Sequence, residues 1–269
     1  TTGSNNVAVG SAALDALQTA GSNVAVGANC LSACTTSFNT AVGFNAARDT
    51  TSGLANVAVG TSSLVSNTTG DNCVAIGLDC LQQNTTADNN VAVGRDAMKQ
   101  NTTGHSNVAV GSYSSTSLTT GHQNVSVGMS AFQSATTAIY STAVGYNALR
   151  TQTTGNSNTA IGNASLQNST TGNSNVALGY NSLQLLTTGD NNVALGMWAG
   201  TYVNALTTGQ YNVLLGNFTR GSTTTPSRQH VIAYNMGALA GDNTFSVQAS
   251  SGAYQSNNSS SWSTTSDRR

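Results

Sequence analysis

Charge is almost absent from this sequence. Asp, Glu, Lys and Arg make up 6% of its 269 residues, glutamate does not occur, Lys99 is the only lysine, and the formal net charge is −1. Nucleic acids and anionic membrane surfaces are held by clustered Lys and Arg. The composition therefore excludes a basic binding stripe, and we expect no nucleic acid among the partners.

Long apolar segments, proline and aromatic residues are scarce as well. No run of 18 or more apolar residues occurs, Pro226 is the only proline, and aromatic residues make up 6% of the chain. A transmembrane helix needs a longer apolar run, so we expect no membrane insertion. Low charge accompanies disorder when apolar residues are sparse and irregular, but here they recur in strict register. The sequence therefore predicts an ordered protein.

Cysteine is also rare and occurs only as Cys30, Cys34, Cys73 and Cys80. Cys30 and Cys80 each stand three residues after a regularly spaced glycine, where other repeats have Ala, Ser or Thr. We interpret them as small buried thiols rather than as a disulfide or metal framework. The histidines and cysteines show no spacing typical of a zinc site or a nucleophilic triad, so the sequence predicts no metal and no cofactor.

The abundant feature is a repeat marked by glycine. From Gly43 to Gly196 every interval between the marker glycines is 17 residues, and each glycine ends a phrase such as Asn-Val-Ala-Val-Gly. The marker glycines are Gly10, Gly27, Gly43, Gly60, Gly77, Gly94, Gly111, Gly128, Gly145, Gly162, Gly179, Gly196 and Gly216. A fixed short period is typical of stacked repeats, and dense Gly and β-branched residues disfavour helix. The sequence predicts an all-β, parallel β-solenoid or β-roll of about 13 rungs.

A short apolar phrase with a period of two precedes each marker glycine. Val or Thr stands three residues before the glycine, Val, Ile or Leu stands one before it, and Ala lies between them in eleven of the thirteen rungs. Alternate residues of a strand point to opposite sides. We interpret this alanine column as an outward face packed closely against another protein surface, the axis of a homotrimer. Its members are Ala8, Ala25, Ala41, Ala58, Ala75, Ala92, Ala109, Ala143, Ala160, Ala177 and Ala194.

Other columns indicate how a rung closes. An apolar residue, usually Leu, stands four residues after the glycine, and a second short strand or bend is expected there. A Thr-Thr-Gly connector, as at residues 68–70, provides a tight turn. Asn occupies the fourth position before the glycine in eleven rungs. We expect these stacked Asn side chains to bond to each other and to the turn backbone.

The period ends after Gly216. We therefore divide the chain into a β-solenoid repeat domain, residues 1–216, and a segment of residues 217–269 that contains Pro226, Arg220 and Arg228. A solenoid needs its open end covered, so we interpret the second segment as a cap and transition.

The phrase Asn-Asn-Val-Ala-Val-Gly at residues 5–10 and again at residues 89–94 resembles the Asn-x-Val-Ala-Ile-Gly repeats of YadA-like heads in trimeric autotransporter adhesins. The resemblance implies a left-handed parallel β-roll of three chains around one axis. Those heads have a shorter repeat than the 17 residues of this chain.

The phrase at residues 261–269 resembles the lead-in to the endosialidase-type intramolecular chaperone of phage tail fibres and spikes, which opens with Ser-Asp-x-Arg-Leu-Lys. Ser266 and Asp267 match the start of that phrase and would form the chaperone junction. The resemblance implies a C-terminal domain, missing here, that helps the trimer to form and is then cut off near the junction.

Together the two resemblances imply a structural and adhesive component of a viral tail fibre, with a phage as the expected source and the virion as the location. The expected form is a stiff homotrimeric rod that supports attachment to a host cell-surface receptor, glycans included, beside other fibre or tail proteins. A bacterial trimeric surface adhesin head, at the bacterial cell surface, is the first alternative. The second is an ice-binding β-solenoid, because threonines recur at every rung from Thr102 to Thr187.

Aromatic residues at unusual positions are the candidate receptor contacts. Tyr113 and Trp198 both stand two residues after a marker glycine, where small or polar residues are the rule, and Tyr202 follows closely. Exposed aromatic faces stack on sugar rings, which makes Trp198, Tyr202 and Tyr113 receptor-binding candidates. The alternative is compensating packing, because Gly200 and Ser115 replace the core leucine in the same two rungs.

One turn column holds Asp71, Asp88, His105 and His122 in consecutive rungs. Such residues could hold a transition metal or Ca²⁺, but Asn and Asp fill the same column elsewhere, so we interpret it as a solvated turn face.

Asp79 and Asp96 share another column in adjacent rungs. Two close carboxylates suit a retaining glycosidase, which would make the protein a capsule depolymerase. The same column elsewhere holds Asn and Ser, so we interpret it as a polar outer face and expect no enzymatic activity.

Overall fold

The structure is a computed structural model that describes residues 2–201, 205–219, 225, 230–233, 245–248, 253–255 and 263–264. It divides into two compact units, Thr1–Tyr140 and Ser141–Arg269. The described residues form strands and turns and include no helix, hence none that could cross a membrane.

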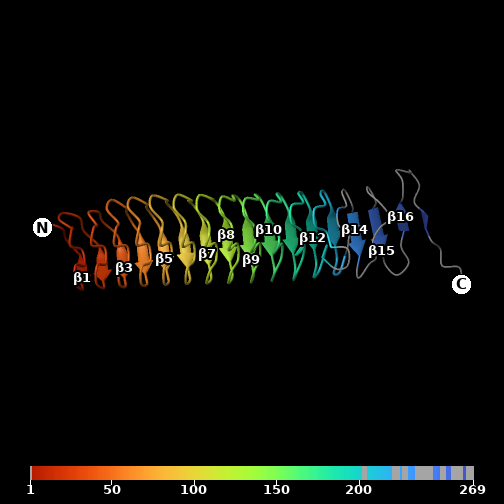
Figure 1. Ribbon diagram of the computed structural model, residues 1–269. Coiled ribbons are helices and arrows are strands. Elements are labelled where there is room, and N and C mark those ends of the chain that lie inside the picture. Colours follow the sequence, from red (N-terminus) through yellow and green to blue (C-terminus); the bar gives the residue numbers. More distant parts are fainter. Residues whose placement is uncertain are drawn as a thin grey trace. The chain divides into compact units, whose positions relative to one another are not determined.

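Each unit is a parallel β-solenoid, with one three-residue strand directly before each marker glycine. The strands of each unit lie side by side in chain order, with the turn segments on the opposite side of the coils (Figure 1). The first unit contains β1 (Val7–Val9), β2 (Val24–Val26), β3 (Thr40–Val42), β4 (Val57–Val59), β5 (Val74–Ile76), β6 (Val91–Val93), β7 (Val108–Val110) and β8 (Val125–Val127). With the first five strands of the second unit, a strand precedes each of the 13 marker glycines, so the predicted β-solenoid is confirmed.

The second unit begins with five strands of the same kind and continues beyond the last marker glycine. It contains β9 (Thr142–Val144), β10 (Thr159–Ile161), β11 (Val176–Leu178), β12 (Val193–Leu195), β13 (Val213–Leu215), β14 (His230–Ala233), β15 (Phe245–Gln248), β16 (Ala253–Gln255) and β17 (Ser263–Thr264). Strands β9 to β15 pair in parallel, whereas β15–β16 and β16–β17 pair antiparallel. Parallel pairing thus continues past residue 216, the boundary drawn from the sequence.

Turns, rather than a second strand, close each coil. In the rung of Gly94, Asn89, Asp96 and Met98 have positive φ values of 59°, 55° and 47°. These conformations point the amides of Asp96 and Met98 toward opposite neighbours. Asp96 N–H donates to Leu78 O of the preceding rung, and Met98 N–H donates to Ser114 O of the following rung, both at 3.0 Å. Positive φ is uncommon for residues other than glycine. Here the hydrogen bonds between rungs offset its cost.

The alanine column lies inside the coil, so its interpretation as an outward face is wrong. The ten alanines from Ala25 to Ala194 are fully buried within a single chain, and only Ala8, in the first strand, is exposed. Leucines four residues after the marker glycines, such as Leu64 and Leu81, are also fully buried and fill the same interior. The space that remains accepts a methyl group, which explains why alanine dominates. The Val and Ile columns on either side of it point outward.

The asparagine column forms the predicted ladder. Asn90 Oδ1 accepts the backbone N–H of Asn107 at 2.9 Å, and Asn107 Oδ1 accepts that of Asn124 at 3.0 Å. Nδ2 groups of the ladder also donate to turn carbonyls, as Asn90 does to Gly104 O at 2.8 Å. The ladder therefore satisfies buried polar groups on both sides of every rung that carries Asn.

Candidate subunit interface and other candidate sites

An apolar stripe runs along the outside of the strands in each unit. It consists of the side chains three residues and one residue before each marker glycine, which are Val or Thr and Val, Ile or Leu. We call it the valine stripe. Ile76 and Ile161 are each 39% exposed, and no strand from β1 to β13 carries a charged side chain. The stripe therefore presents branched apolar groups to solvent without charge to solvate them.

Large apolar residues also stand next to the valine stripe, one residue after several marker glycines. In the first unit these exposed residues are Phe44, Leu78 and Met129, and in the second they are Tyr146, Tyr180 and Met197. They widen the apolar surface at three rungs of each unit.

The valine stripe of the first unit is about as large as the largest apolar patch on a typical monomer. Eight strands spaced by about 4.8 Å make it roughly 38 Å long in the first unit, and its width of roughly 10 Å gives an area of about 400 Å². Patches of that size on monomers are often functional, and larger ones mark interaction sites. Sequence reasoning placed this surface on the alanine side because a period of two separates the faces without saying which is inside.

Trp198 and Tyr113, two of the three receptor candidates, are half-buried at equivalent positions in different units. Trp198 packs edge-on against Tyr180, with ring centroids 5.7 Å apart. Tyr113 lies under the guanidinium of Arg95, which is 5.3 Å from its ring centroid. Each aromatic side chain thus rests on the residue that follows the preceding marker glycine. Tyr202 lies outside the described residues.

Compensation for the missing core leucines comes from residues inside the coil. A Cβ on Gly200 would lie 2.6 Å from Leu183 Cδ2 and 3.0 Å from Leu214 Cδ1, so these two leucines fill the space that a leucine at position 200 would occupy. Ser115 replaces the other leucine, and its hydroxyl lies 2.7 Å from that of Ser126. In each case the alanine column is interrupted in the next rung, by Leu214 and by Ser126. The core is thereby filled without a contribution from Trp198 or Tyr113.

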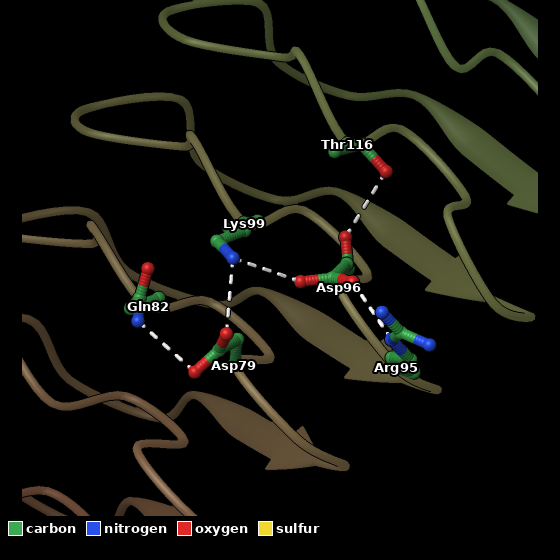
Figure 2. Close-up of polar contacts among 6 residues, drawn as sticks. All are labelled: Asp79, Gln82, Arg95, Asp96, Lys99 and Thr116. Carbon is green, nitrogen blue, oxygen red and sulfur yellow. Dashed lines mark hydrogen bonds and ion pairs between the residues drawn. The ribbon is translucent and has the colours of Figure 1, made fainter.

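Lys99 joins the two carboxylates of the candidate glycosidase pair (Figure 2). Its Nζ lies 3.0 Å from Asp79 Oδ2 and 3.0 Å from Asp96 Oδ1. Gln82 Nε2 donates to Asp79 Oδ1, and Arg95 Nε pairs with Asp96 Oδ2 at 3.1 Å. Hydrogen bonds from Lys99 to the carboxylates raise its pKa. The arrangement is a cross-rung ion-pair network in which both carboxylates already have cationic or amide partners.

The turn column of Asp and His residues forms hydrogen bonds and ring stacks. Asp71 Oδ1 accepts the N–H of Leu54, and Asp88 Oδ1 accepts that of Asp71, both at 2.7 Å. His105 and His122 stack with centroids 4.8 Å apart. Among the described residues, no group of three or more His, Cys, Asp or Glu is placed to hold a metal ion.

All four cysteines are buried free thiols. Burial raises the pKa of Cys73 to about 11 and that of Cys80 to about 12, with the negative charges of Asp71 and Asp88 adding to the first and that of Asp96 to the second. Cys30 and Cys80 therefore occupy the buried small-residue column, as predicted.

The threonine ladder has two columns with different surroundings. The hydroxyl of Thr102 donates to Thr119 O at 3.2 Å, and that of Thr170 donates to Thr187 O at 3.1 Å, so this column is bonded within the protein. The next residues, such as Thr103 and Thr171, form the exposed column.

No family model matches the chain, and no curated protein or solved structure matches it either.

Proposed function

We propose that the chain is a structural and adhesive component of a viral, phage-type tail fibre, in which three copies form a stiff rod that supports attachment to a host receptor. The valine stripe is the observation that carries the proposal. It repeats in register on every rung, so three parallel copies around an axis along the stacking direction would bury equivalent side chains at every level. The valine stripe, rather than the buried alanine column, is therefore the proposed contact between the three copies.

The composition of the stripe favours an obligate assembly. Interfaces between permanently associated subunits resemble a domain core cut in half, and their centres are depleted of charge. Val, Ile and Leu on every strand from β1 to β13 match that composition. Burial of such side chains contributes roughly 25 cal/mol for each Å² removed from water.

The fibre role also draws on the sequence. The resemblance to YadA-like heads and the chaperone-like lead-in at Ser266 and Asp267, which lie outside the described residues, both belong to trimeric proteins that project from a surface. The mechanism is mechanical rather than catalytic, and three copies would turn weak receptor contacts into avid binding. The bacterial surface adhesin head shares this architecture and remains the alternative location.

The test is the native mass of the full chain, with charge introduced into the stripe. We expect the parent protein to have three times the 27.2 kDa mass of the chain. Ile76→Lys with Val110→Lys should yield monomers, because each lysine would be buried unpaired at the axis. The matched control is Thr69→Lys with Thr103→Lys, at exposed turn positions. A monomeric parent protein, or a stable trimer that tolerates both stripe lysines, would contradict the proposal.

The ice-binding alternative has one observation in its favour, the exposed threonine column that contains Thr103 and Thr171. A regular row of hydroxyls can order water, although its neighbouring column is bonded within the protein. Thermal hysteresis of the parent protein that is lost when these exposed threonines are replaced would favour this function over the fibre.

A further inference from the structure

Three exposed residues of the second unit and the half-buried Trp198 form a ledge beside the valine stripe. Tyr146, Asn163 and Tyr180 each follow a marker glycine in three successive rungs, and Trp198 packs against Tyr180 from the next rung. We call these four residues the aromatic ledge. Tyr146 is 46% exposed, Tyr180 is 47% exposed, and Asn163 between them is also exposed. Two strand spacings separate the tyrosines, a distance of roughly 10 Å.

Trp198 occupies a position that the fold does not favour for an aromatic residue. The equivalent position holds Asn, Asp, Ser or Ala in most rungs, and Trp198 has a φ of 59°. Every residue of this column has a positive φ of 53–61°, so the backbone conformation belongs to the repeat, and Trp198 differs from most of its column in the size and aromatic character of its side chain.

Core packing does not account for Trp198. Leu183 and Leu214 fill the space beside Gly200, and Trp198 remains half-buried on the surface, with its ring against the exposed Tyr180. Trp198 thus departs from the small or polar residues of its column without completing the core. Its indole and the Tyr180 ring instead offer an aromatic surface on which a ligand can stack.

The chemistry of the ledge selects the class of ligand. Aromatic rings offer apolar faces that stack on the C–H face of a sugar ring, and an amide between them can donate to and accept from sugar hydroxyls. Arg150 and Asp190 are the charged side chains among the described residues of this unit, and neither lies one or two residues after a marker glycine. Anionic sugars are normally recognised through Arg or Lys.

We infer that the aromatic ledge binds a neutral oligosaccharide, with Tyr146 and Tyr180 stacking on two sugar rings and Asn163 bonding to the hydroxyls between them. Trp198 holds the Tyr180 ring in place and extends the platform. The inference rests on the attachment function proposed above, because it names the chemical class of the receptor.

The chain permits a direct optical test, because Trp198 and Trp262 are its only tryptophans. In a Trp262→Phe background Trp198 is the sole indole fluorophore. Titration with cellohexaose, maltohexaose and N-acetylchitohexaose should give a saturable change in its emission with at least one of them, confirmed by calorimetry. Tyr180→Ser and Trp198→Asn should each weaken that binding at least tenfold.

A matched control separates binding from stability. Tyr113→Asn also replaces an aromatic residue by Asn, at the position of the first unit that is equivalent to Trp198, and it should leave binding unchanged. Trp198→Asn restores a residue common in its column, so it should not lower the melting temperature. A lower melting temperature with unchanged binding would assign Trp198 a structural role and overturn the inference.

Native mass, measured on the same samples, distinguishes the two proposals. A trimeric parent protein that binds none of the three sugars overturns the ledge and leaves the fibre intact. Loss of the trimer in Tyr180→Ser would place the ledge inside the subunit interface, which also overturns it. Sugar binding by a monomeric parent protein supports the ledge and overturns the trimer.

Discussion

Ser126 lies inside the coil with its hydroxyl oxygen 2.7 Å from that of Ser115. Ser126 stands in the alanine column and Ser115 in the column that usually holds leucine, so two hydroxyls meet where other rungs place a methyl group against a large apolar side chain. Ser114 also places its hydroxyl 2.7 Å from Ser126 Oγ. The three buried hydroxyls thus have hydrogen-bond partners in one another, and the serines at positions 115 and 126 are energetically coupled.

We expect Ser126→Ala to destabilise the protein by about 1–3 kcal/mol, because it removes the partner of a buried hydroxyl. The double variant Ser115→Leu with Ser126→Ala restores the pair found in other rungs and should be more stable than Ser126→Ala alone. Denaturant unfolding of the two single variants and the double variant gives the coupling free energy. Additive effects would contradict the proposed pairing.

Gly200 and Leu214 also replace the usual leucine and alanine of the two core columns, here by exchanging the large and the small residue. Leu214→Ala should cost about 2–5 kcal/mol, because it opens a cavity next to a residue without a side chain. Gly200→Leu alone should also destabilise, since a Cβ there would lie 2.6 Å from Leu183 Cδ2 and 3.0 Å from Leu214 Cδ1. The combination Gly200→Leu with Leu214→Ala should recover much of the loss, measured by thermal unfolding. No recovery would show that the two positions do not share one space.

These two exchanges mark what the sequence could and could not predict. The 17-residue period and the alternation of Val, Ala and Val located every strand from β1 to β13, and the Asn column predicted its ladder. Alternation does not say which face is inside when both faces are apolar, so the alanines were placed outside. Two departures from the repeat indicated that the alanine and leucine columns face each other inside the coil. Where the leucine column has Gly200 the alanine column of the next rung has Leu214, and where it has Ser115 the alanine column of the next rung has Ser126.

The candidate site depended on the same choice. Once the alanines are inside, the outer Val and Ile columns become the exposed apolar surface. The ledge residues Tyr146 and Tyr180 were missed because the position after the marker glycine varies too much to form a sequence pattern. The positive φ of leucines such as Leu81 was also unpredictable, since it follows from hydrogen bonds between rungs.

Gly94 should not tolerate a side chain. It has a φ of 134°, and a Cβ would lie 2.6 Å from the backbone C and O of Gly111 in the next rung. Since backbone cannot move aside, Gly94→Ala should cost about 2–5 kcal/mol. Thr103→Ala, at an exposed turn position, is the control and should change stability by less than about 0.5 kcal/mol. Similar unfolding midpoints for the two variants would show that the marker glycine is not required by the stacking.

Cys73 and Cys80 should make the stability of the first unit fall at alkaline pH. Burial raises the pKa of these thiols to about 11 and about 12 in the folded protein, whereas a thiol in an unfolded chain has a pKa of about 8.5. The stabilisation is fully present below pH 8.5 and is lost as the pH rises through the folded values, because the unfolded chain releases its protons first. At pH 10.5 the loss should be about 2.5 kcal/mol for each thiol.

The matched variant replaces both cysteines with the residues most common in their columns, Cys73→Asn and Cys80→Ala. Asn at position 73 can accept the N–H of Asn90 through Oδ1, as Asn56 Oδ1 accepts that of Cys73 at 2.9 Å, so it should also raise stability at neutral pH. Denaturant unfolding at pH 7.5 and pH 10.5 measures both effects, and tyrosine ionisation is common to the two proteins. The parent protein should lose more stability between these pH values than the variant. An equal loss would mean that both thiols are solvated in the folded protein, which would contradict their burial beneath the asparagine ladder and the alanine column.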